Sequence, residues 1–302
     1  MFGYLLCNVA RGENLVLLPP LRVGETINLE MTMTRERNVT GQPKTKGTGT
    51  TPVRVEVLNV ADEQKVIGWT TGKPKIEDAR LDARIAKTID PMLELATDQT
   101  VELVFDEEFT PRSIRNLKQV MQISQKAIDL LEKSLPKDNT SAAVIPRVRE
   151  MFSNPDSVQT ILIQKPGRYF LVYGWELEPG QPREVEMSLP SPFGPEPLPA
   201  TVTIELKRFQ STDTQYVVLY EQRLDEKGVQ RVIRDAVQKF AGDKKLLDKQ
   251  IPKFDVEDRG EFKINRATGW VEHALVTRVT TSNDGSQIES FEFRSVPQPG
   301  RP

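Results

Sequence analysis

The feature of this sequence that most constrains its fold is a strand pattern that occurs twice, about 150 residues apart. Residues 24–31 (GETINLEM) are echoed by residues 180–187 (GQPREVEM), and residues 53–57 (VRVEV) are echoed by residues 202–206 (VTIEL). A further apolar strand, a helical stretch and a hairpin follow in the same order in each half. Because self-similarity at a fixed spacing indicates architecture, we expect an internal duplication with two related β-rich halves. The alternative is that amphipathic strands resemble one another by chance.

Residues 24–39 alternate between apolar and polar side chains, as a strand with one solvated face does. Ile27 and Leu29 fall on one face, whereas Asn28 and Glu30 fall on the other. This pattern is typical of an antiparallel sheet. We therefore predict an α+β protein, mainly antiparallel β, in which a half-barrel or twisted sheets carry packed helices. Further strands are expected at residues 53–60, 65–71, 101–105, 201–210, 215–223, 261–266, 270–281 and 287–295.

Apolar residues at helical spacing predict amphipathic helices at residues 110–135 and 227–241. The first of these is expected to start at Thr110 and Pro111, a helix-capping pair. Weaker helical patterns cover residues 79–96, 142–152 and 156–163.

Two segments are predicted to be irregular or peripheral. The aromatic segment Tyr169–Trp175, which precedes a proline-rich stretch, is interpreted as an edge strand. Gly41–Pro52, rich in Thr and Gly, is interpreted as a loop. The resulting division of the chain is a first β-rich half at 1–109, a helical insert at 110–165, a second β-rich half at 166–296 and a disordered tail at 297–302.

Charge and hydropathy exclude several partners. With 41 basic and 43 acidic residues the net charge is -2, so we expect no nucleic-acid partner. No apolar run reaches the roughly 20 residues that span a bilayer, so no transmembrane segment is predicted. Met1–Cys7 is apolar but lacks the basic region and the length of a signal peptide. We expect an ordinary terminal segment there; the alternative is a longer signal that starts upstream of Met1.

The sequence offers few groups for catalysis or metal binding. One cysteine, Cys7, and one histidine, His273, are too few for most zinc, haem and iron–sulfur sites. His273 lies in an alternating strand, where a half-buried structural histidine is expected. We predict no cofactor, no metal site and no catalytic residue. A pair of carboxylates acting as in glycoside hydrolysis remains an open alternative, because such pairing is spatial.

Aromatic and methionine residues are the candidate ligand contacts. Methionine adapts to irregular ligands, and curved sheets commonly enclose apolar molecules. The alternative is that these residues form a solid core. The candidates are Met31, Met33, Trp69, Phe105, Tyr169, Phe170, Tyr173 and Trp175.

The order of motifs resembles that of uncharacterised exported bacterial proteins, families of unknown function predicted to lie in the cell envelope. The likeness rests on the strand Gly24–Met33, the proline-rich Leu189–Gly194 and the closing hairpin Gly260–Trp270. More distantly, the chain resembles the half-barrels of bacterial lipoprotein and lipid carriers. This resemblance implies a sheet that wraps an apolar ligand under helices, and a place in the periplasm or cell envelope, with the cytoplasm as the alternative.

Three functions follow as hypotheses. The first is a non-enzymatic envelope protein that binds an apolar or lipid-like ligand, or a hydrophobic segment of another envelope protein, on a concave sheet face. The second is a structural or protein-interaction module without a small-molecule ligand. The third is a carboxylate-based hydrolase.

Overall fold

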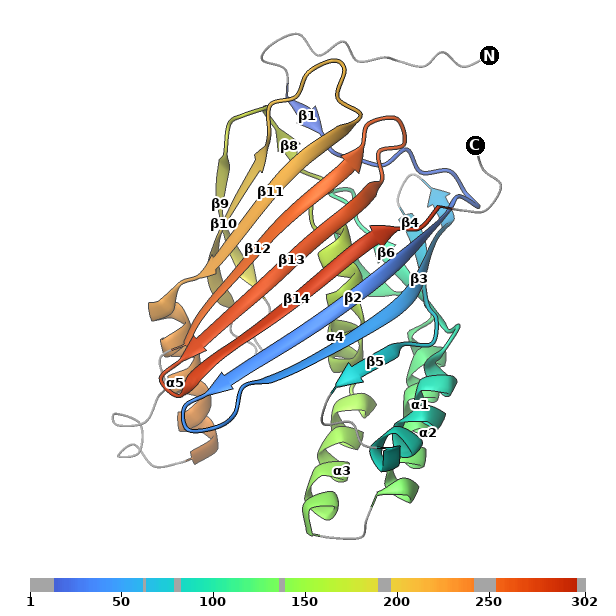
Figure 1. Ribbon diagram of the computed structural model, residues 1–302, viewed down its shortest axis with the longest axis vertical. Coiled ribbons are helices and arrows are strands. Elements are labelled where there is room, and N and C mark those ends of the chain that lie inside the picture. The colour runs from blue at the N-terminus through green and yellow to red at the C-terminus, as the bar shows by residue number, and fades with distance from the viewer. Residues whose placement is uncertain are drawn as a thin grey trace.

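The computed structural model describes residues 14–61, 64–78, 83–135, 139–189, 197–241 and 254–297. One antiparallel sheet of 12 strands runs through both halves of the chain (Figure 1). Its strands, in spatial order, are β7 (Pro111–Ile114), β6 (Thr100–Phe105), β4 (Gln64–Thr71), β3 (Thr45–Ala61), β2 (Thr26–Val39), β14 (Gly285–Ser295), β13 (Val271–Ser282), β12 (Phe254–Asn265), β11 (Gln215–Leu224), β10 (Leu198–Leu206) and β9 (Arg183–Leu189), with β5 (Lys75–Asp78) paired beside them on β3. A separate two-stranded ladder joins β1 (Leu15–Val16) to β8 (Glu176–Leu177). The predicted fold class, mainly antiparallel β with a few helices, is confirmed.

The described residues form five helices beside the sheet. They are α1 (Ala83–Ala96), α2 (Leu117–Ser134), α3 (Asn139–Ser153), α4 (Pro155–Phe170) and α5 (Glu226–Ala241). Helix α4 lies against one face of the sheet, which we call the inner face (Figure 1). Helix α5 contacts β10 and β12, and α1, α2 and α3 pack in sequence on one another. Among the described residues, none of the helices combines the length and the apolar character that crossing a bilayer requires.

The two halves of the chain meet at β2 and β14, near the middle of the sheet. Met31 lies opposite Phe293 and Met33 lies opposite Phe291 in this antiparallel pairing. These inward side chains therefore place the cores of both halves next to each other. The first half runs β2, β3, β4, β5, α1, β6, β7 and the second runs β9, β10, β11, α5, β12, β13, so the first half has one strand, β5, that the predicted common order lacks. An origin by duplication and a half-barrel shape stay predictions.

The core lies between α4 and the inner face. Alternate residues of the long strands point inward and are buried, as β10 shows with Val202, Ile204 and Leu206, none of which is exposed. Helix α4 begins at Asn154, whose side chain accepts hydrogen bonds from the backbone of Asp156 and Ser157. Asn154 thus fixes the start of the helix whose far end carries the core aromatics.

A smaller apolar cluster lies under α5. Val229 and Val232 of this helix pack on Leu198 of β10. Asp225 precedes the helix, and its side chain accepts hydrogen bonds from the backbone of Lys227 and Gly228. The predicted helix at 227–241 is therefore confirmed; it starts one residue earlier, at Glu226, directly after Asp225.

The prediction of an edge strand at Tyr169–Trp175 was wrong. Tyr169 and Phe170 end α4, and the chain then turns. Gly174 makes the turn possible: its φ is +82°, and a Cβ there would lie 1.8 Å from the carbonyl oxygen of Glu108. Aromatic residues favour strands in general, but here burial against the sheet decides the conformation.

Two further boundaries differ from the sequence prediction. Thr110–Pro111 does not start a helix: Pro111 opens the edge strand β7, and α2 starts after Asn116. Proline is tolerated on an edge strand because it lacks only one ladder donor. The predicted loop at Gly41–Pro52 is largely strand β3, since Thr48 and Thr50 pair with the long strand β2. The segments 1–13, 190–196 and 298–302, including Cys7 and most of the predicted tail, lie outside the described residues.

Candidate ligand-binding site

The structure brings the eight predicted ligand contacts together, in and around the core at the end of α4. Six of them are buried: Met31, Trp69, Phe105, Tyr169, Phe170 and Tyr173. Met33 and Trp175 are partly buried and pack against the same cluster. The arrangement is that of a packed core, and contact of these residues with a ligand stays a prediction.

Phe170 lies at the centre of this aromatic cluster. Its ring centroid is 4.9 Å from that of Phe105 and 5.0 Å from that of Tyr169, both in edge-to-face geometry. The Tyr169 hydroxyl donates to the carbonyl oxygen of Val271 at 2.9 Å, and the Tyr173 hydroxyl accepts from the Val271 amide at 2.8 Å. Burial raises the pKa of both tyrosines, so both hydroxyls stay protonated and keep these hydrogen bonds.

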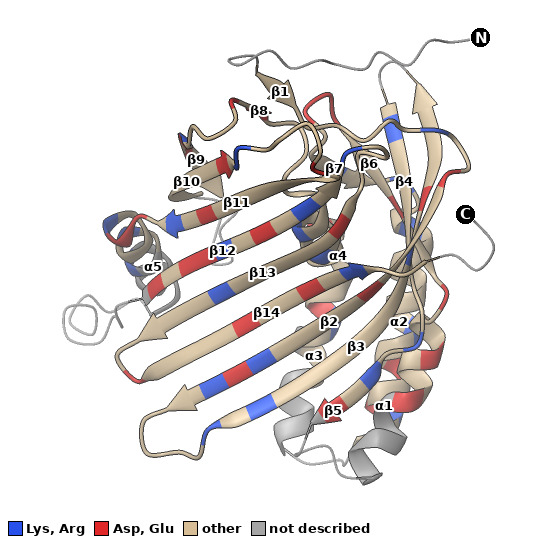
Figure 2. Ribbon diagram, turned by 45° about the horizontal axis from the view of Figure 1, so that its top comes forward, with Lys and Arg blue, Asp and Glu red and all other residues tan. Residues whose placement is uncertain are grey.

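Next to this core, the inner face changes from apolar to charged within one row of side chains, which we call the charged row. Its members lie directly opposite one another on the neighbouring strands from β11 to β2: Gln222, Asp258, Arg278, Glu289 and Arg35. Figure 2 shows acidic and basic residues distributed along these central strands. Side chains alternate along each strand, so the charged row shares a face with the core residues two positions away.

Within the charged row, each carboxylate is engaged by an arginine. Arg278 donates two parallel hydrogen bonds to Asp258, from Nε at 2.7 Å and from Nη2 at 2.6 Å. Gln222 donates to the same carboxylate at 3.2 Å. Arg35 donates from Nε to Glu289 at 2.7 Å. The hydrogen bonds to Asp258 raise the pKa of Arg278, which keeps the bidentate pair charged.

Helix α4 brings a further cation, Arg168, to this place and carries a second one, Lys165, near it. The guanidinium carbon of Arg168 lies 3.8 Å from the centroid of the Phe291 ring, which belongs to the inner face of β14. Loss of hydration lowers the pKa of Arg168, and the neighbouring charge of Arg278 lowers it further. Lys165 precedes Arg168 by about one helical turn. Its side chain keeps solvent-accessible surface, but partial desolvation and the charge of Arg168 lower the pKa of Lys165 as well.

The arginines of the charged row reach solvent, whereas Gln222 and Asp258 at its other end are buried. The side chain of Arg35 is 54% exposed and that of Arg278 is 37% exposed. By contrast, Val276, the preceding inward residue of β13, is only 2% exposed. The strands therefore continue beyond the part of the sheet that the core covers.

An apolar strip lies on the inner face at the β2 end of the charged row. Met33 of β2 is opposite Gly49 of β3, and Gly49 is opposite Ile76 of β5. Ile76 is 40% exposed. A Cβ placed at Gly49 would meet only the Lys75 carbonyl oxygen, at 3.8 Å, so the middle of the strip has room above it. Phe291 is opposite Met33, so the strip begins where Arg168 lies.

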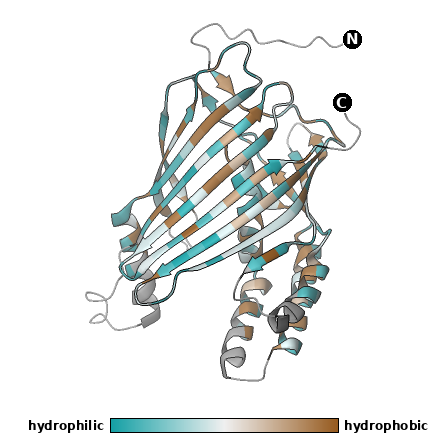
Figure 3. Ribbon diagram, in the orientation of Figure 1, coloured by the Kyte–Doolittle hydropathy of each residue, from teal (hydrophilic) through white to brown (hydrophobic). Residues whose placement is uncertain are grey.

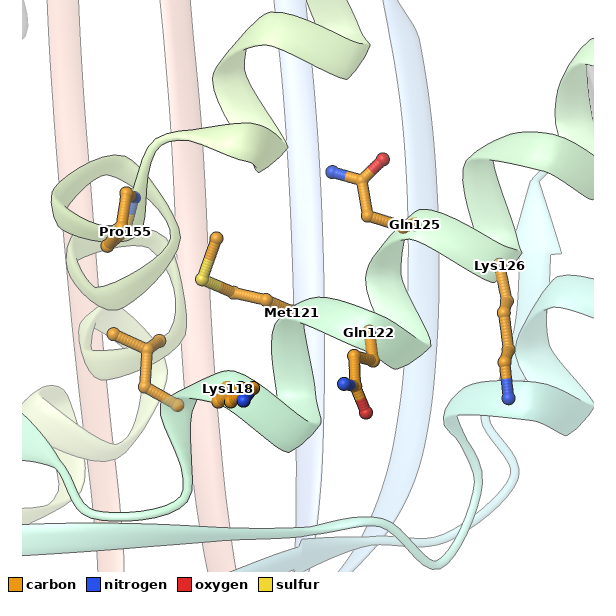
Figure 4. Close-up of a pocket in the computed structure, with 7 residues that line it drawn as sticks. Lys118, Met121, Gln122, Gln125, Lys126 and Pro155 are labelled. Carbon is orange, nitrogen blue, oxygen red and sulfur yellow. The ribbon is translucent and has the colours of Figure 1, made fainter.

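A separate surface groove of about 660 Å³ lies along α2, and Figure 4 shows its lining. It is lined by Leu117, Lys118, Met121, Gln122, Gln125, Lys126 and Pro155. Gln125 bridges to the end of α3 through hydrogen bonds to the Phe152 carbonyl oxygen at 3.0 Å and to Ser153 Oγ at 3.1 Å. The groove is shallow and open, and hydrocarbon makes up most of its surface.

The outer face of the sheet carries His273. Its Nε2 lies 2.9 Å from Glu292 Oε1, and this hydrogen bond, with help from Arg294, lowers the pKa of Glu292. The imidazole is half-buried in a sheet-surface ion cluster. Among the described residues, no three His, Cys, Asp or Glu side chains converge as they would around a metal ion.

The charged row and the cations of α4 were missed by the sequence reasoning. The row had a readable signal, since β13, β14 and β2 each carry two inward apolar residues with an inward charge two positions beyond them, after them on β13 and β2 and before them on β14. Lys165 and Arg168 had no such signal, because their position depends on how α4 docks on the sheet.

Comparisons with known proteins add little to this description. No protein-family model matches the sequence, and no curated protein matches it. Lipovitellin, studied for its lipid–protein interactions, superposes with a TM-score of 0.43 at 7% identity, over 93% of this chain and 26% of its own. This chain thus spans about a quarter of the lipovitellin chain.

Two bacterial structures are more distant. DynF, from the dynemicin biosynthesis pathway of Micromonospora chersina, has a TM-score of 0.23 at 7% identity and covers 97% of this chain and 91% of its own. An outer membrane channel from Pseudomonas putida F1 has a TM-score of 0.22 at 9% identity and covers 92% of this chain and 97% of its own. At these scores, none of the three likenesses indicates a shared function.

Proposed function

We propose that this chain is a non-enzymatic binding protein that holds an apolar or lipid-like ligand against the inner face of its sheet. The observation that carries the proposal is the incomplete cover of that face. The core fills the space beside the end of α4, whereas Arg278, Arg35 and the neighbouring Ile76 stay accessible on the same face. A sheet face that is neither packed nor uniformly polar is a surface suited to a ligand.

The apolar strip supplies the hydrophobic contacts in this proposal. Met33 adapts its shape to an irregular ligand, and Ile76 adds an exposed branched side chain. Gly49 between them leaves room for a ligand to lie close to the backbone. Of the eight residues predicted from the sequence, Met33 is therefore the one that we assign to ligand contact. A location in the bacterial periplasm or cell envelope is part of the same proposal and rests on the resemblance described above.

The alternative of a protein-interaction module is favoured by the groove along α2. Its half-buried Met121 and Leu117 offer a partner an apolar floor. The hydrolase alternative finds less support among the described residues. The two inward carboxylates of the charged row, Asp258 and Glu289, are each engaged by an arginine, so neither is free to act as an acid or a base.

Native mass spectrometry of gently purified protein tests the proposal, with a denatured sample as the reference. We expect additional mass that disappears on denaturation and corresponds to an apolar or amphiphilic molecule. In parallel, fluorescence titration with the neutral probe N-phenylnaphthylamine measures binding to purified protein. Absence of both the additional mass and probe binding would contradict the proposal and favour the interaction module.

A pair of matched variants locates the site. Met33→Gln changes a partly exposed apolar residue of the inner face, and Leu275→Gln changes one on the outer face that is 41% exposed. We expect Met33→Gln to weaken probe binding by about fivefold, since it removes roughly 1 kcal/mol of apolar contact, and Leu275→Gln to leave it unchanged. Equal effects of the two substitutions on probe binding would show that the probe does not bind at Met33 on the inner face.

A further inference from the structure

We infer that the ligand of the inner face is an amphiphile with an anionic head group, and that Lys165, Arg168 and Arg278 bind that group. This inference rests on the proposed function and adds to it the charge of the ligand and its direction. Three observations support it: an excess of cations around the charged row, the position of these cations at the edge of the core, and the apolar strip that starts there.

The excess of cations follows from the pairing of charges. Asp258 is engaged by Arg278 and Glu289 is engaged by Arg35. Lys165 and Arg168 then remain, and among the residues that the structure describes neither forms an ion pair or a hydrogen bond. Four cations thus share two carboxylates, a local excess of two positive charges.

This excess is unfavourable for the protein alone. Arg168 is repelled by Lys165 and Arg278 and attracted by Asp258 and Glu289, and with its loss of hydration the balance lowers its pKa; Lys165 remains exposed to solvent, and its pKa is lowered as well. Arg168 cannot simply leave for solvent without giving up its contact with the Phe291 ring. Converging cations with an incomplete set of counterions are characteristic of sites that bind anions, because a bound anion relieves the repulsion and supplies the missing hydrogen-bond acceptors.

The position of the cations indicates an amphiphile. Phe291, under Arg168, marks the border between the buried core and the accessible inner face. From Phe291, the apolar strip continues across β2 and β3 to Ile76 on β5. Three strand spacings correspond to about 14 Å, a length that a medium alkyl chain spans. A head group at the cations therefore leaves a tail lying along Met33, Gly49 and Ile76.

Competition against the bound neutral probe tests this inference. Dodecanoate and 1-dodecanol have the same chain length and differ in the charge of the head group, and inorganic phosphate represents an anion without a tail. We expect dodecanoate to displace the probe at about tenfold lower concentration than dodecanol, and phosphate to displace none. Probe binding without any preference for dodecanoate would overturn the inference and leave the proposed function intact. If the protein bound no probe at all, both the inference and the proposed function would be contradicted.

Charge-removing variants assign the residues. We expect Lys165→Gln and Arg168→Gln each to weaken dodecanoate binding by about tenfold and to leave dodecanol binding unchanged. Lys263→Gln is the matched control: Lys263 lies between the inward Phe262 and Ile264 and therefore points to the outer face. Lys165→Arg is expected to retain binding. Thermal unfolding of each variant checks the fold. Equal losses for both ligands, or an equal loss in Lys263→Gln, would contradict the assignment.

Discussion

The inner face of the sheet has two regions that are built from the same strands: the packed aromatic core and the charged row beside it. On β14, Phe293 and Phe291 are buried in the aromatic core, whereas Glu289, the next inward residue, belongs to the charged row. On β13, Val276 is buried and Arg278 is accessible. A change from packed to accessible within one inward step shows that strand geometry alone does not decide which part of a sheet becomes core.

The difference coincides with the position of the end of α4. Tyr169 and Phe170, at the C-terminal end of this helix, are buried in the core, and Arg168 lies over Phe291 at the border of the core. On β13, β14 and β2 the inward residues up to this border are apolar, and the next inward residues are charged: Arg278, Glu289 and Arg35.

The largest effect is expected from the centre of the core. Phe170→Ala removes the ring that contacts Phe105, Tyr169 and Trp69 in a site that is 1% exposed. We expect the free energy of unfolding to fall by about 4 kcal/mol, because the cavity cannot be refilled by solvent or by small shifts of the neighbours. Chemical denaturation measures it. Met33→Ala, at the border of the core, is the comparison and should cost about 1 kcal/mol. Similar losses at both positions would show that the two regions are equally packed.

A smaller loss is expected in the charged row. Asp258→Ala leaves Arg278 and Gln222 without their shared acceptor in a partly buried setting. We expect a loss of about 2 kcal/mol, less than for a fully buried ion pair because Arg278 is partly hydrated. The neighbouring Glu257, which pairs with Arg223 and Arg259 at the surface, provides the control. Glu257→Ala should cost about 0.5 kcal/mol in the same denaturation experiment. An equal cost for the two would mean that the charged row is a surface feature.

A third prediction separates the tyrosine hydroxyls from their rings. Tyr169→Phe keeps the buried ring and removes the hydrogen bond to the Val271 carbonyl oxygen. We expect a loss of about 1 kcal/mol, the usual net value of a neutral buried hydrogen bond. Tyr216→Phe is a suitable control, since this half-exposed tyrosine packs through its ring on Phe209. A loss near zero for Tyr169→Phe would show that the core holds α4 by ring packing alone.

The sequence predicts the covered region better than the accessible one, and the reason is physical. Period-two alternation identifies the strand from Thr26 to Val39 and the class of sheet, because burial imposes the pattern directly. The alternation does not identify the strand at residues 45–52, where Thr and Gly indicate a loop but pairing with β2 makes a strand. It also fails for Tyr169 and Phe170, whose helical conformation depends on contacts with the sheet. Tertiary contacts override local preference in both cases.

In the candidate site, too, some residues could be predicted from the sequence and others could not. Met33 could be predicted, since it lies on the inward side of an obvious strand. The inward charges Arg278 and Glu289 could be found by following strand parity past the last apolar residue. Lys165 and Arg168 could not be found, because a lysine and an arginine near the end of a helix normally indicate a solvated surface or a favourable helix dipole. Only the docking of α4 shows that Arg168 faces β14, with Lys165 near it.

The smallest effect, and the one that most sharply separates the two regions, concerns Lys165. Phe170→Ala, Asp258→Ala and Tyr169→Phe each cost stability, but Lys165→Gln should raise the free energy of unfolding at pH 7, by about 0.5 kcal/mol or less after solvent screening. The reason is that desolvation and Arg168 lower the pKa of Lys165 below its ordinary value of 10.5.

The lowered pKa of Lys165 also determines how the free energy of unfolding changes with pH. A lysine with a lowered pKa in the folded state disfavours folding while it is charged, so the stability of the unsubstituted protein should rise as the pH passes through that lowered pKa toward 10.5. Lys165→Gln should lack this rise, so its advantage should be greatest at neutral pH and disappear at alkaline pH. Denaturation in a pH series measures both proteins, with Lys263→Gln as the control that has no such advantage. A core residue is kept for stability, whereas a ligand site can be kept at the expense of stability. If Lys165→Gln were less stable than the unsubstituted protein at pH 7, the lysine would be a structural residue and the accessible region would be an extension of the core.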